Sequence, residues 1–254
     1  LIEEFLEGEE MSYFIISDGI TIKNFGTAQD HKRVFEGDKG PNTGGMGAYS
    51  PSRLITKELE IKIIKKIIEP TILALKELGV SFEGFLYAGL MIVKDEPFLI
   101  EYNVRMGDPE CQTILPKLQT DFIDIIDSCC NKKLNEISIK WNNKKSLCVV
   151  ICSNGYPGDF QKNIEIKDFN SLNLKEDDFI FHAGTINKNK KIYSNGGRVL
   201  NFVSLSDNFN QAKDKVYDNL KNLNWKEGFY RKDIGFKVLK KWGSYLDTLK
   251  EKKY

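Results

Sequence analysis

Residues 84–110 read GFLYAGLMIVKDEPFLIEYNVRMGDPE and contain two apolar runs separated by a short polar turn. The apolar runs 85–93 and 97–102 flank the polar turn 94–96, a pattern that predicts a β-hairpin. Side chains alternate between the two faces of a strand, so residues two apart point the same way. The end of the second run therefore predicts one polar row, formed by Glu101, Asn103 and Arg105.

This polar row is a candidate ligand site. A carboxylate beside apolar neighbours costs several kcal/mol to desolvate unless it has a partner. Two partners are open for Glu101: an ion pair with Arg105, or a bound hard cation, whose preferred ligands are carboxylate and amide oxygens. The amide of Asn103 favours the cation, because an ion pair alone does not explain an amide beside the acid. A structural ion pair remains the alternative.

Strand signals extend outward from this hairpin in both directions. A loop is predicted for residues 37–50, because five glycines fall between positions 37 and 47. The loop lacks the G-K-[ST] ending of a Walker P-loop; its backbone N–H groups either cradle an anion or belong to a flexible surface loop. The predicted strands are 13–16 paired with 20–25 as a hairpin, and then 147–152, 179–183 and 199–205.

Helix signals separate these strands. Apolar residues recur at helical spacing over 59–78, after Thr56 as a candidate cap. Pro70 is expected to kink or divide this helix, and Gly79 to end it. Two more helices are predicted, over 122–130 and about 207–223. The mixture predicts an α+β fold, and the Asn- and Lys-rich stretch 131–145 is the best candidate for a domain boundary.

Composition excludes several classes of protein. The 254 residues carry 37 basic and 36 acidic side chains, and this balance argues against a nucleic-acid-binding protein. Five cysteines form no C-x-x-C pair, so neither a zinc ribbon nor a disulfide framework is indicated, and a reducing compartment is expected. No apolar run reaches the roughly 18 residues of a membrane span. The start at Leu1 has no initiator Met and reads as though it begins within a protein.

Other catalytic patterns are missing from the sequence. It has no nucleophile elbow, no H-E-x-x-H and no EF-hand loop, so covalent catalysis is not indicated. His31 and His182 have no nucleophile pattern beside them, and both are interpreted as structural histidines.

Several strings closely resemble one family, phosphoribosylamine–glycine ligase of the ATP-grasp superfamily. The resemblance runs from Leu1 to about Leu239. In the first half it is carried by residues 3–10, 29–33, 40–51, 84–90 and 105–110, and in the second half by residues 155–159, 181–185, 195–199 and 231–235.

The resemblance implies a fold and a reaction. Residues 1–133 would be the C-terminal part of an ATP-grasp domain, and residues 134–254 a small mixed α/β C-terminal domain. ATP would phosphorylate the carboxylate of glycine, and 5-phosphoribosylamine would attack the acyl phosphate, giving glycinamide ribonucleotide, ADP and phosphate in de novo purine biosynthesis. The family places an N-terminal portion before Leu1, so this chain alone is expected to be inactive. A cytoplasmic monomer without nucleic-acid or membrane partners is implied.

The resemblance also assigns roles to single residues. Glu101 and Asn103 would bind Mg²⁺ or Mn²⁺, and Arg105 would meet the charge on the transferred phosphoryl group. No acid lies within 85–93, so the ligands of a second metal stay open. The residues implied for ATP are Glu3, Glu4, Phe5 and Leu6 at the adenine and Glu9 or Glu10 at the ribose; those implied for the substrates are Asp30, Lys32, Arg33, Asn42, Thr43, Gly44, Gly45, Asp108 and Glu110.

Two alternatives remain. The first is another ATP-grasp carboxylate–amine ligase or a carboxylase with a different acceptor. The second is a nucleotide-binding fragment without catalytic activity.

Overall fold

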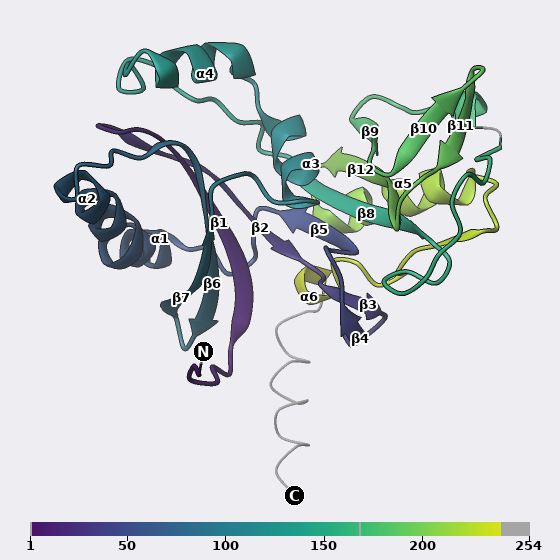
Figure 1. Cartoon of the computed structure of the whole chain (residues 1–254), viewed down its shortest axis with the longest axis horizontal. Helices are drawn as coiled ribbons and strands as arrows, with labels where there is room; N and C mark the ends of the chain where they lie inside the picture. The colour runs from purple at the N-terminus through teal and green to yellow at the C-terminus, as the bar shows by residue number, and fades with distance from the viewer. Residues whose placement is uncertain (1, 168, 240–254) are drawn as a thin grey trace, which may run out of the picture.

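A computed structural model describes residues 2–167 and 169–239. The strands of its main sheet are β1 (Glu9–Asp18), β2 (Ile22–Asp30), β5 (Gly47–Ser50), β6 (Glu83–Val93), β7 (Glu96–Asn103), β8 (Lys145–Ser153), β9 (Asp178–His182), β12 (Arg198–Ser206) and β13 (Gly228–Phe229). Within the described residues these nine strands form one antiparallel sheet in the order β7-β6-β1-β2-β5-β8-β12-β9, with β13 beside β8 (Figure 1). Two small hairpins stand apart, β3 (Arg33–Phe35) with β4 (Lys39–Asn42) and β10 (Thr185–Lys188) with β11 (Lys191–Ser194).

The hairpin that carries the polar row is confirmed, and it contains a β-bulge. Leu90 pairs with Leu99, but Gly89 pairs with Glu101, so Ile100 is the extra residue. A Cβ added at Gly89 would lie 3.1 Å from Cγ of Glu101. The missing side chain at position 89 therefore leaves the space in which the Glu101 side chain lies.

The loop predicted over residues 37–50 is partly wrong. β4 occupies Lys39–Asn42, and β5 is a fully buried strand at Gly47–Ser50. β5 pairs with β2 on one side and with β8 on the other, so it joins the strands that come before and after residues 131–145 into one sheet. Its four residues show no alternation of apolar and polar side chains that would predict a strand. Their pairing with β2 and β8, which are distant in the sequence, makes them one.

The predicted helices are confirmed, and the first is divided as expected. The helices are α1 (Lys57–Ile63), α2 (Glu69–Glu77), α3 (Glu110–Ile114), α4 (Phe122–Cys130), α5 (Phe209–Lys221) and α6 (Phe236–Leu239), with a π-helical turn at Ile64–Ile68 and 3₁₀ turns at Leu115–Lys117 and Phe169–Ser171. Thr56 caps α1 by accepting a hydrogen bond from the Leu59 N–H at 3.1 Å. The π turn immediately precedes Pro70, where a regular helical ladder would lose a donor.

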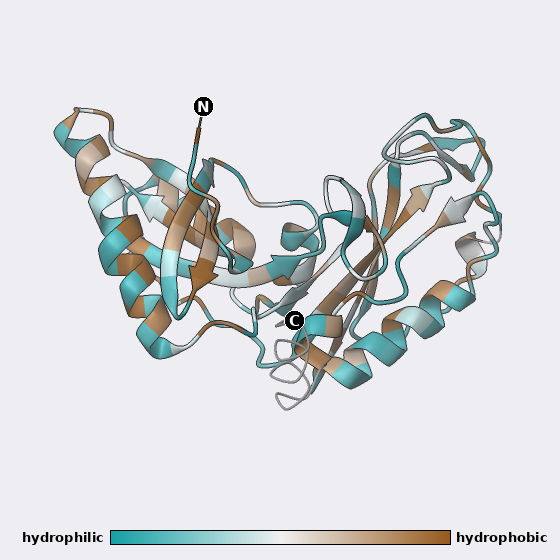
Figure 2. Cartoon of the chain, turned by 90° about the horizontal axis from the view of Figure 1, so that it is seen from below, coloured by the Kyte–Doolittle hydropathy of each residue, from teal (hydrophilic) through white to brown (hydrophobic). Residues whose placement is uncertain are grey.

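Helices cover the sheet on both faces. Leu59 and Ile63 of α1 pack with Tyr13 and Leu86 of the sheet, while Phe14 of β1 packs with Ile125 of α4 on the opposite face. Burial of each such side chain contributes about 1.5–3 kcal/mol to folding. The covering helices carry both teal and brown residues, as expected for helices with one buried face (Figure 2). No helix in the described part of the chain has the length and apolarity needed to span a membrane.

Candidate functional site

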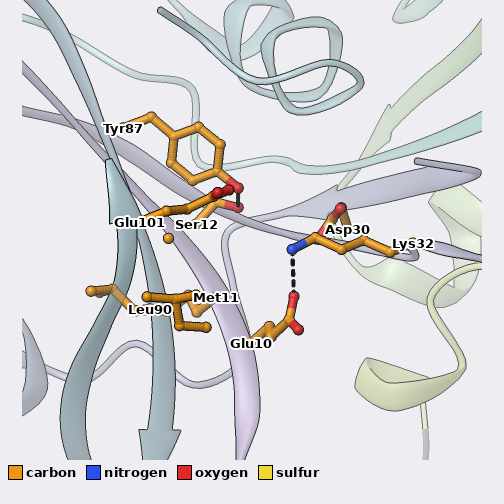
Figure 3. A pocket seen from close by; sticks show the side chains of 10 residues that line it. Glu10, Met11, Ser12, Asp30, Lys32, Tyr87, Leu90 and Glu101 are labelled. Carbon is orange, nitrogen blue, oxygen red and sulfur yellow. Dashed lines mark hydrogen bonds and ion pairs between the residues drawn. The ribbon is translucent and has the colours of Figure 1, made fainter. Parts of the chain in front are cut away.

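A pocket of about 120 Å³ lies across the neighbouring strands β7, β6, β1 and β2 (Figure 3). This volume is below the roughly 300 Å³ typical of small-molecule sites. Its lining residues are Glu10, Met11, Ser12, Asp30, Lys32, Tyr87, Gly89, Leu90, Ile100 and Glu101. Four of them were sequence predictions, namely Glu10, Asp30, Lys32 and Glu101, so the fold brings members of the predicted ATP, substrate and metal sets to one place.

The apolar part of the pocket was missed from the sequence. Met11 and Leu90 are buried and lie opposite each other in the β1–β6 ladder, and Ile100 is the bulged residue of β7. Nothing local distinguishes them from core residues. The signal that could have found them is the pairing of β1 with β6.

Glu101 and Asn103 lie together, as the polar row predicts. Nδ2 of Asn103 donates to Oε1 of Glu101 at 3.3 Å, and Glu101 is exposed to solvent. Arg105 lies beyond the end of β7, and its Nη1 donates to the Met106 carbonyl oxygen at 3.0 Å. Glu101 and Arg105 form no ion pair within the described residues, so the structural ion-pair alternative is not realised.

The donor set at Glu101 fits a hard divalent cation. A half-turn of the Asn103 amide exchanges Oδ1 with Nδ2, which brings an amide oxygen next to the Glu101 carboxylate. Across residues 2–167 and 169–239, no three His, Cys, Asp or Glu side chains cluster as a complete metal cage. Mg²⁺ is commonly held by one or two carboxylates together with substrate phosphates, so two protein ligands suffice for a shared site.

A charged group just after the end of β2 lies in the same pocket as Glu101. Lys32 Nζ contacts Oε2 of Glu10 at 2.6 Å, as Figure 3 shows. Burial opposes the charged form of Lys32, but Asp30 and Glu10 together raise its pKa above the usual value. Burial, and then the nearby Glu110 carboxylate, raise the pKa of Asp30 to about 7. The pocket therefore holds a carboxyl group that changes its charge near neutral pH.

The two candidates for the ribose contact have different surroundings. Glu9 forms an ion pair with Arg53, whereas Glu10 lines the pocket. Glu3, Glu4 and Phe5 are exposed and Leu6 is half-buried, in a segment without regular secondary structure. The role predicted for residues 3–6 at the adenine stays a prediction.

Glu110 is buried at the start of α3. Its Oε1 accepts hydrogen bonds from the Ser12 hydroxyl at 3.0 Å and from the Tyr87 hydroxyl at 3.2 Å. Burial, with Glu110 next, raises the pKa of Tyr87 above its usual value, so this hydroxyl remains a donor. The carboxylate thus joins α3 to β1 and β6 directly beneath the pocket.

Four backbone N–H groups of the glycine-rich loop have hydrogen-bond partners within the chain. The N–H groups of Thr43 and Met46 donate to the carbonyl oxygens of Lys32 and His31, each at 2.8 Å. The Gly45 N–H donates to Oγ1 of Thr43 at 3.0 Å. The Gly44 N–H donates to the Tyr156 hydroxyl at 3.0 Å. These four N–H groups bond within the chain, which counts against the anion-cradle interpretation at these positions, and the flexible-loop interpretation stays a prediction. Asn42 and Arg33 are exposed, and Nη1 of Arg33 donates to the Gly40 carbonyl oxygen at 2.8 Å.

A buried arginine fastens the same loop from the far end of the chain. Arg231 is 2% exposed, and its guanidinium donates to Asp38 Oδ1 at 2.8 Å and to both carboxylate oxygens of Asp233. The Gly235 N–H donates to Nε2 of His31 at 3.0 Å, and burial lowers the pKa of His31. His31 is thus a neutral structural residue, as the sequence predicted.

Comparisons with known proteins agree with this architecture. The family model described as phosphoribosylglycinamide synthetase, ATP-grasp (A) domain, matches residues 1–111, and the model of the C domain of the same enzyme matches residues 146–237. The chain belongs to the phosphoribosylglycinamide synthetase family. The resemblance drawn from the sequence motifs is confirmed.

Members of this family are similar over nearly the whole chain. A phosphoribosylamine–glycine ligase from Brucella melitensis is 44% identical over 95% of this chain and 56% of its own length. A crystal structure of the ligase from Thermotoga maritima has a TM-score of 0.79 at 32% identity, covering 92% of this chain and 57% of that one. The chain thus spans a little over half the length of these family members.

A more distant structure shows how widely the fold is shared. The biotin carboxylase domain of the Hydrogenobacter thermophilus 2-oxoglutarate carboxylase, in complex with MgADP, ADP and bicarbonate, has a TM-score of 0.63 at 13% identity. That likeness covers 87% of this chain and 46% of the carboxylase chain. The predicted α+β, ATP-grasp fold class is confirmed.

Proposed function

We propose that this chain is the part of a phosphoribosylamine–glycine ligase that carries the cation-binding strand and the substrate loop. ATP phosphorylates the carboxylate of glycine, and the amine of 5-phosphoribosylamine then attacks the acyl phosphate. The products are glycinamide ribonucleotide, ADP and phosphate. The observation that carries the proposal is the contact between Glu101 and Asn103 at the rim of a pocket that also contains Lys32 and Glu10.

Different residues of this chain have different roles at the nucleotide. Glu101 and Asn103 would hold Mg²⁺, or Mn²⁺ in its place, and such a cation would neutralise part of the charge of the polyphosphate. The guanidinium of Arg105 meets the transferred phosphoryl group with a fixed fork of donors. Met11, Leu90 and Ile100 offer the purine ring an apolar surface, Glu10 accepts from the ribose hydroxyls, and Glu3, Glu4, Phe5 and Leu6 form the adenine hinge.

The substrate side is built from the end of β2 and the loop that follows it. Lys32 and Arg33 supply positive charge for the carboxylate of glycine or the phosphate of the ribose. Asp30 faces the same space, and the segment Asn42, Thr43, Gly44 and Gly45 shapes it. Asp108 and Glu110 support the site from the turn after β7. The protein needs little covalent catalysis, because positioning and electrostatic neutralisation account for most of the rate acceleration in phosphoryl transfer.

The same proposal includes the pathway, the location and the oligomeric state of the enzyme. It acts in the second step of de novo purine biosynthesis, in the cytoplasm, as a monomer on small-molecule substrates. The nucleotide site is completed by an N-terminal portion of the same protein. Residues 1–133 and 134–254 are its nucleotide-binding and C-terminal domains.

A complementation assay tests the proposal. The chain is mixed with the N-terminal segment of the Brucella melitensis ligase, and ADP release is measured with glycine and 5-phosphoribosylamine, together and singly. We expect turnover only when both substrates, both protein parts and Mg²⁺ are present. The Glu101→Gln chain is the control for the chemistry. No turnover from the wild-type mixture, when the intact Brucella enzyme is active in the same assay, contradicts the proposal.

A bicarbonate-dependent carboxylase is the second candidate. Its support is the shared fold with the Hydrogenobacter carboxylase domain, which at 13% identity concerns architecture alone. The same mixture supplied with bicarbonate in place of glycine separates the two candidates. A strict bicarbonate requirement favours the carboxylase, and nucleotide binding without any turnover favours a non-catalytic fragment.

A further inference from the structure

The backbone N–H and the backbone carbonyl of Gly44 are both bound by residues more than 100 positions later in the chain. Its N–H donates to the Tyr156 hydroxyl at 3.0 Å, and its carbonyl oxygen accepts from Nη1 of Arg198 at 2.6 Å. Tyr156 follows β8, and Arg198 is the first residue of β12. Two elements of the C-terminal half therefore fix the two peptide groups that flank Gly44 in the predicted substrate loop.

The same guanidinium also holds the turn that follows β7. Nη1 of Arg198 donates to the Asp108 carbonyl oxygen at 2.7 Å, and Nη2 contacts Oδ2 of Asp108 at 3.0 Å. Oδ1 of Asp108 accepts from the Gln112 side chain at 2.9 Å, so the carboxylate has partners on both oxygens. A planar fork of donors can bridge a carbonyl and a carboxylate at once, whereas a lysine ammonium cannot reproduce that geometry.

The two segments that Arg198 bridges are in direct steric contact. A Cβ added at Gly44 would lie 2.9 Å from Cζ of Arg198, and one added at Gly45 would lie 2.5 Å from Cδ of Pro109. Gly45 also has φ +113°, a conformation that side chains with a Cβ rarely adopt. Glycine at both positions is thus what allows the loop to lie against the guanidinium and against the turn.

We propose that Arg198 is a positioning residue of the ligase site, which sets the substrate loop at Gly44 against the end of the cation-binding strand at Asp108. It acts through these two segments and does not touch the reacting atoms. Asp108 serves as the anchor of Arg198. We call the hydrogen bonds from Arg198 to Gly44 and Asp108 the clamp. The expected effect on substrate kinetics rests on the proposed ligase function, but the existence of the clamp does not.

Hydrogen exchange on this chain tests the clamp without any activity. In Arg198→Ala, the amides of residues 42–46 and the turn 106–109 are expected to exchange about tenfold faster or more, because a charge-assisted hydrogen-bond bridge is lost. Arg198→Lys should recover only part of the protection, since the fork is missing. Peptides from α4 should be unchanged. Lys191→Ala, which breaks the Lys191–Glu165 pair elsewhere in the C-terminal half, is the matched control and should leave residues 42–46 protected.

Steady-state kinetics of the intact gene product that contains this chain test the positioning role. In Arg198→Ala, kcat/KM for glycine or 5-phosphoribosylamine should fall about tenfold or more, because the loop is misplaced, while KM for ATP changes less than about twofold. Arg198→Lys should be intermediate, and Lys191→Ala should match the wild type.

The outcomes separate the two proposals. Unchanged exchange in residues 42–46 of Arg198→Ala overturns the clamp, whether or not the protein is a ligase. Faster exchange with unchanged substrate kinetics in an active ligase overturns the positioning role. A wild-type protein that binds ATP but never consumes glycine overturns the proposed function, and the exchange experiment still decides the clamp.

Discussion

The pocket lies between two regions that are held in different ways. On one side, which we call the strand side, Glu101–Arg105 extends from an edge hairpin, and Glu101 and Arg105 are exposed. On the other side, which we call the loop side, residues 30–45 are tied to the C-terminal half by Arg198, Tyr156 and Arg231. The strand side thus keeps the side chains of Glu101 and Arg105 accessible, whereas the loop side depends on distant residues for its shape.

From this contrast we expect the loop side to contribute mainly to stability and the strand side mainly to ligand binding. Although burial acts to raise its pKa, Asp38 on the loop side has a pKa far below the usual value, because His31, Lys237 and Arg231 hydrogen-bond to its carboxylate. Breaking such a network leaves charges without partners. Glu101 is exposed and accepts a hydrogen bond from Asn103, so a change there should alter ligand binding and leave folding intact.

The largest effect is expected from removing the buried cation of the loop side. Arg231→Met keeps the volume of the side chain but leaves Asp38 and Asp233 without their guanidinium partner. We expect a loss of about 3–5 kcal/mol in the free energy of unfolding, the range for breaking one partner of a buried ion pair. Urea unfolding of the chain, followed by tryptophan fluorescence, measures it. Lys237→Met removes a more exposed cation from the same Asp38 and should cost less than about 1 kcal/mol. Equal losses would mean that burial does not set the difference.

The next effect concerns the strand side and appears in turnover. Glu101→Gln keeps the shape of the side chain and removes the charge at the proposed cation site. We therefore expect the turnover of the intact gene product to fall about 10²- to 10³-fold, the loss seen when one strong electrostatic contact is removed. The unfolding midpoint should not change. Glu96→Gln, at the other end of β7, is the matched control and should retain wild-type turnover. Unaltered magnesium dependence in Glu101→Gln would contradict the assignment of the cation to the strand side.

A smaller effect is expected where the two sides meet. Gly45 and Gly84 have similar backbone angles, φ +113° and +117°, but a Cβ at Gly45 would collide with Pro109, and one at Gly84 would meet nothing within 4 Å. Gly84→Ala should therefore cost only the strain of about 1–2 kcal/mol. Gly45→Ala should lose about 1–3 kcal/mol more from the added collision. Urea midpoints of the two variants measure the difference, and equal midpoints would show that the loop moves away from the turn easily.

The strand side could be predicted from the sequence because its information is local. The apolar runs 85–93 and 97–102 and the turn between them predict the hairpin, and a spacing of two places Glu101 beside Asn103. Thr56, Pro70 and Gly79 likewise mark the ends and the division of the first helix.

The loop side could not be predicted in the same way, because distant residues determine it. Arg198 bonds to Gly44 across 154 positions, and Arg231 bonds to Asp38 across 193. Their motifs, Gly196-Gly197-Arg198 and Arg231-Lys232-Asp233, identify arginines in polar turns but not their partners. For the same reason the buried strand β5 was interpreted as loop.

The last prediction concerns Asp30, where the two sides face each other across the pocket. Burial and the neighbouring Glu110 raise its pKa to about 7, whereas an unfolded aspartate titrates near about 3.9. Between these values the folded chain binds a proton that the unfolded chain does not bind, so this group's stabilising contribution is complete below about pH 4 and is lost as the pH rises through 7. Asp30→Asn cannot ionise, so its stability relative to the wild type should increase from pH 5 to pH 8. Urea midpoints at the two pH values measure this, with Asp95→Asn, in the turn between β6 and β7, as the control. Parallel pH curves for the wild type and Asp30→Asn would mean that water reaches the carboxylate freely and that the loop side is more open than its hydrogen bonds indicate.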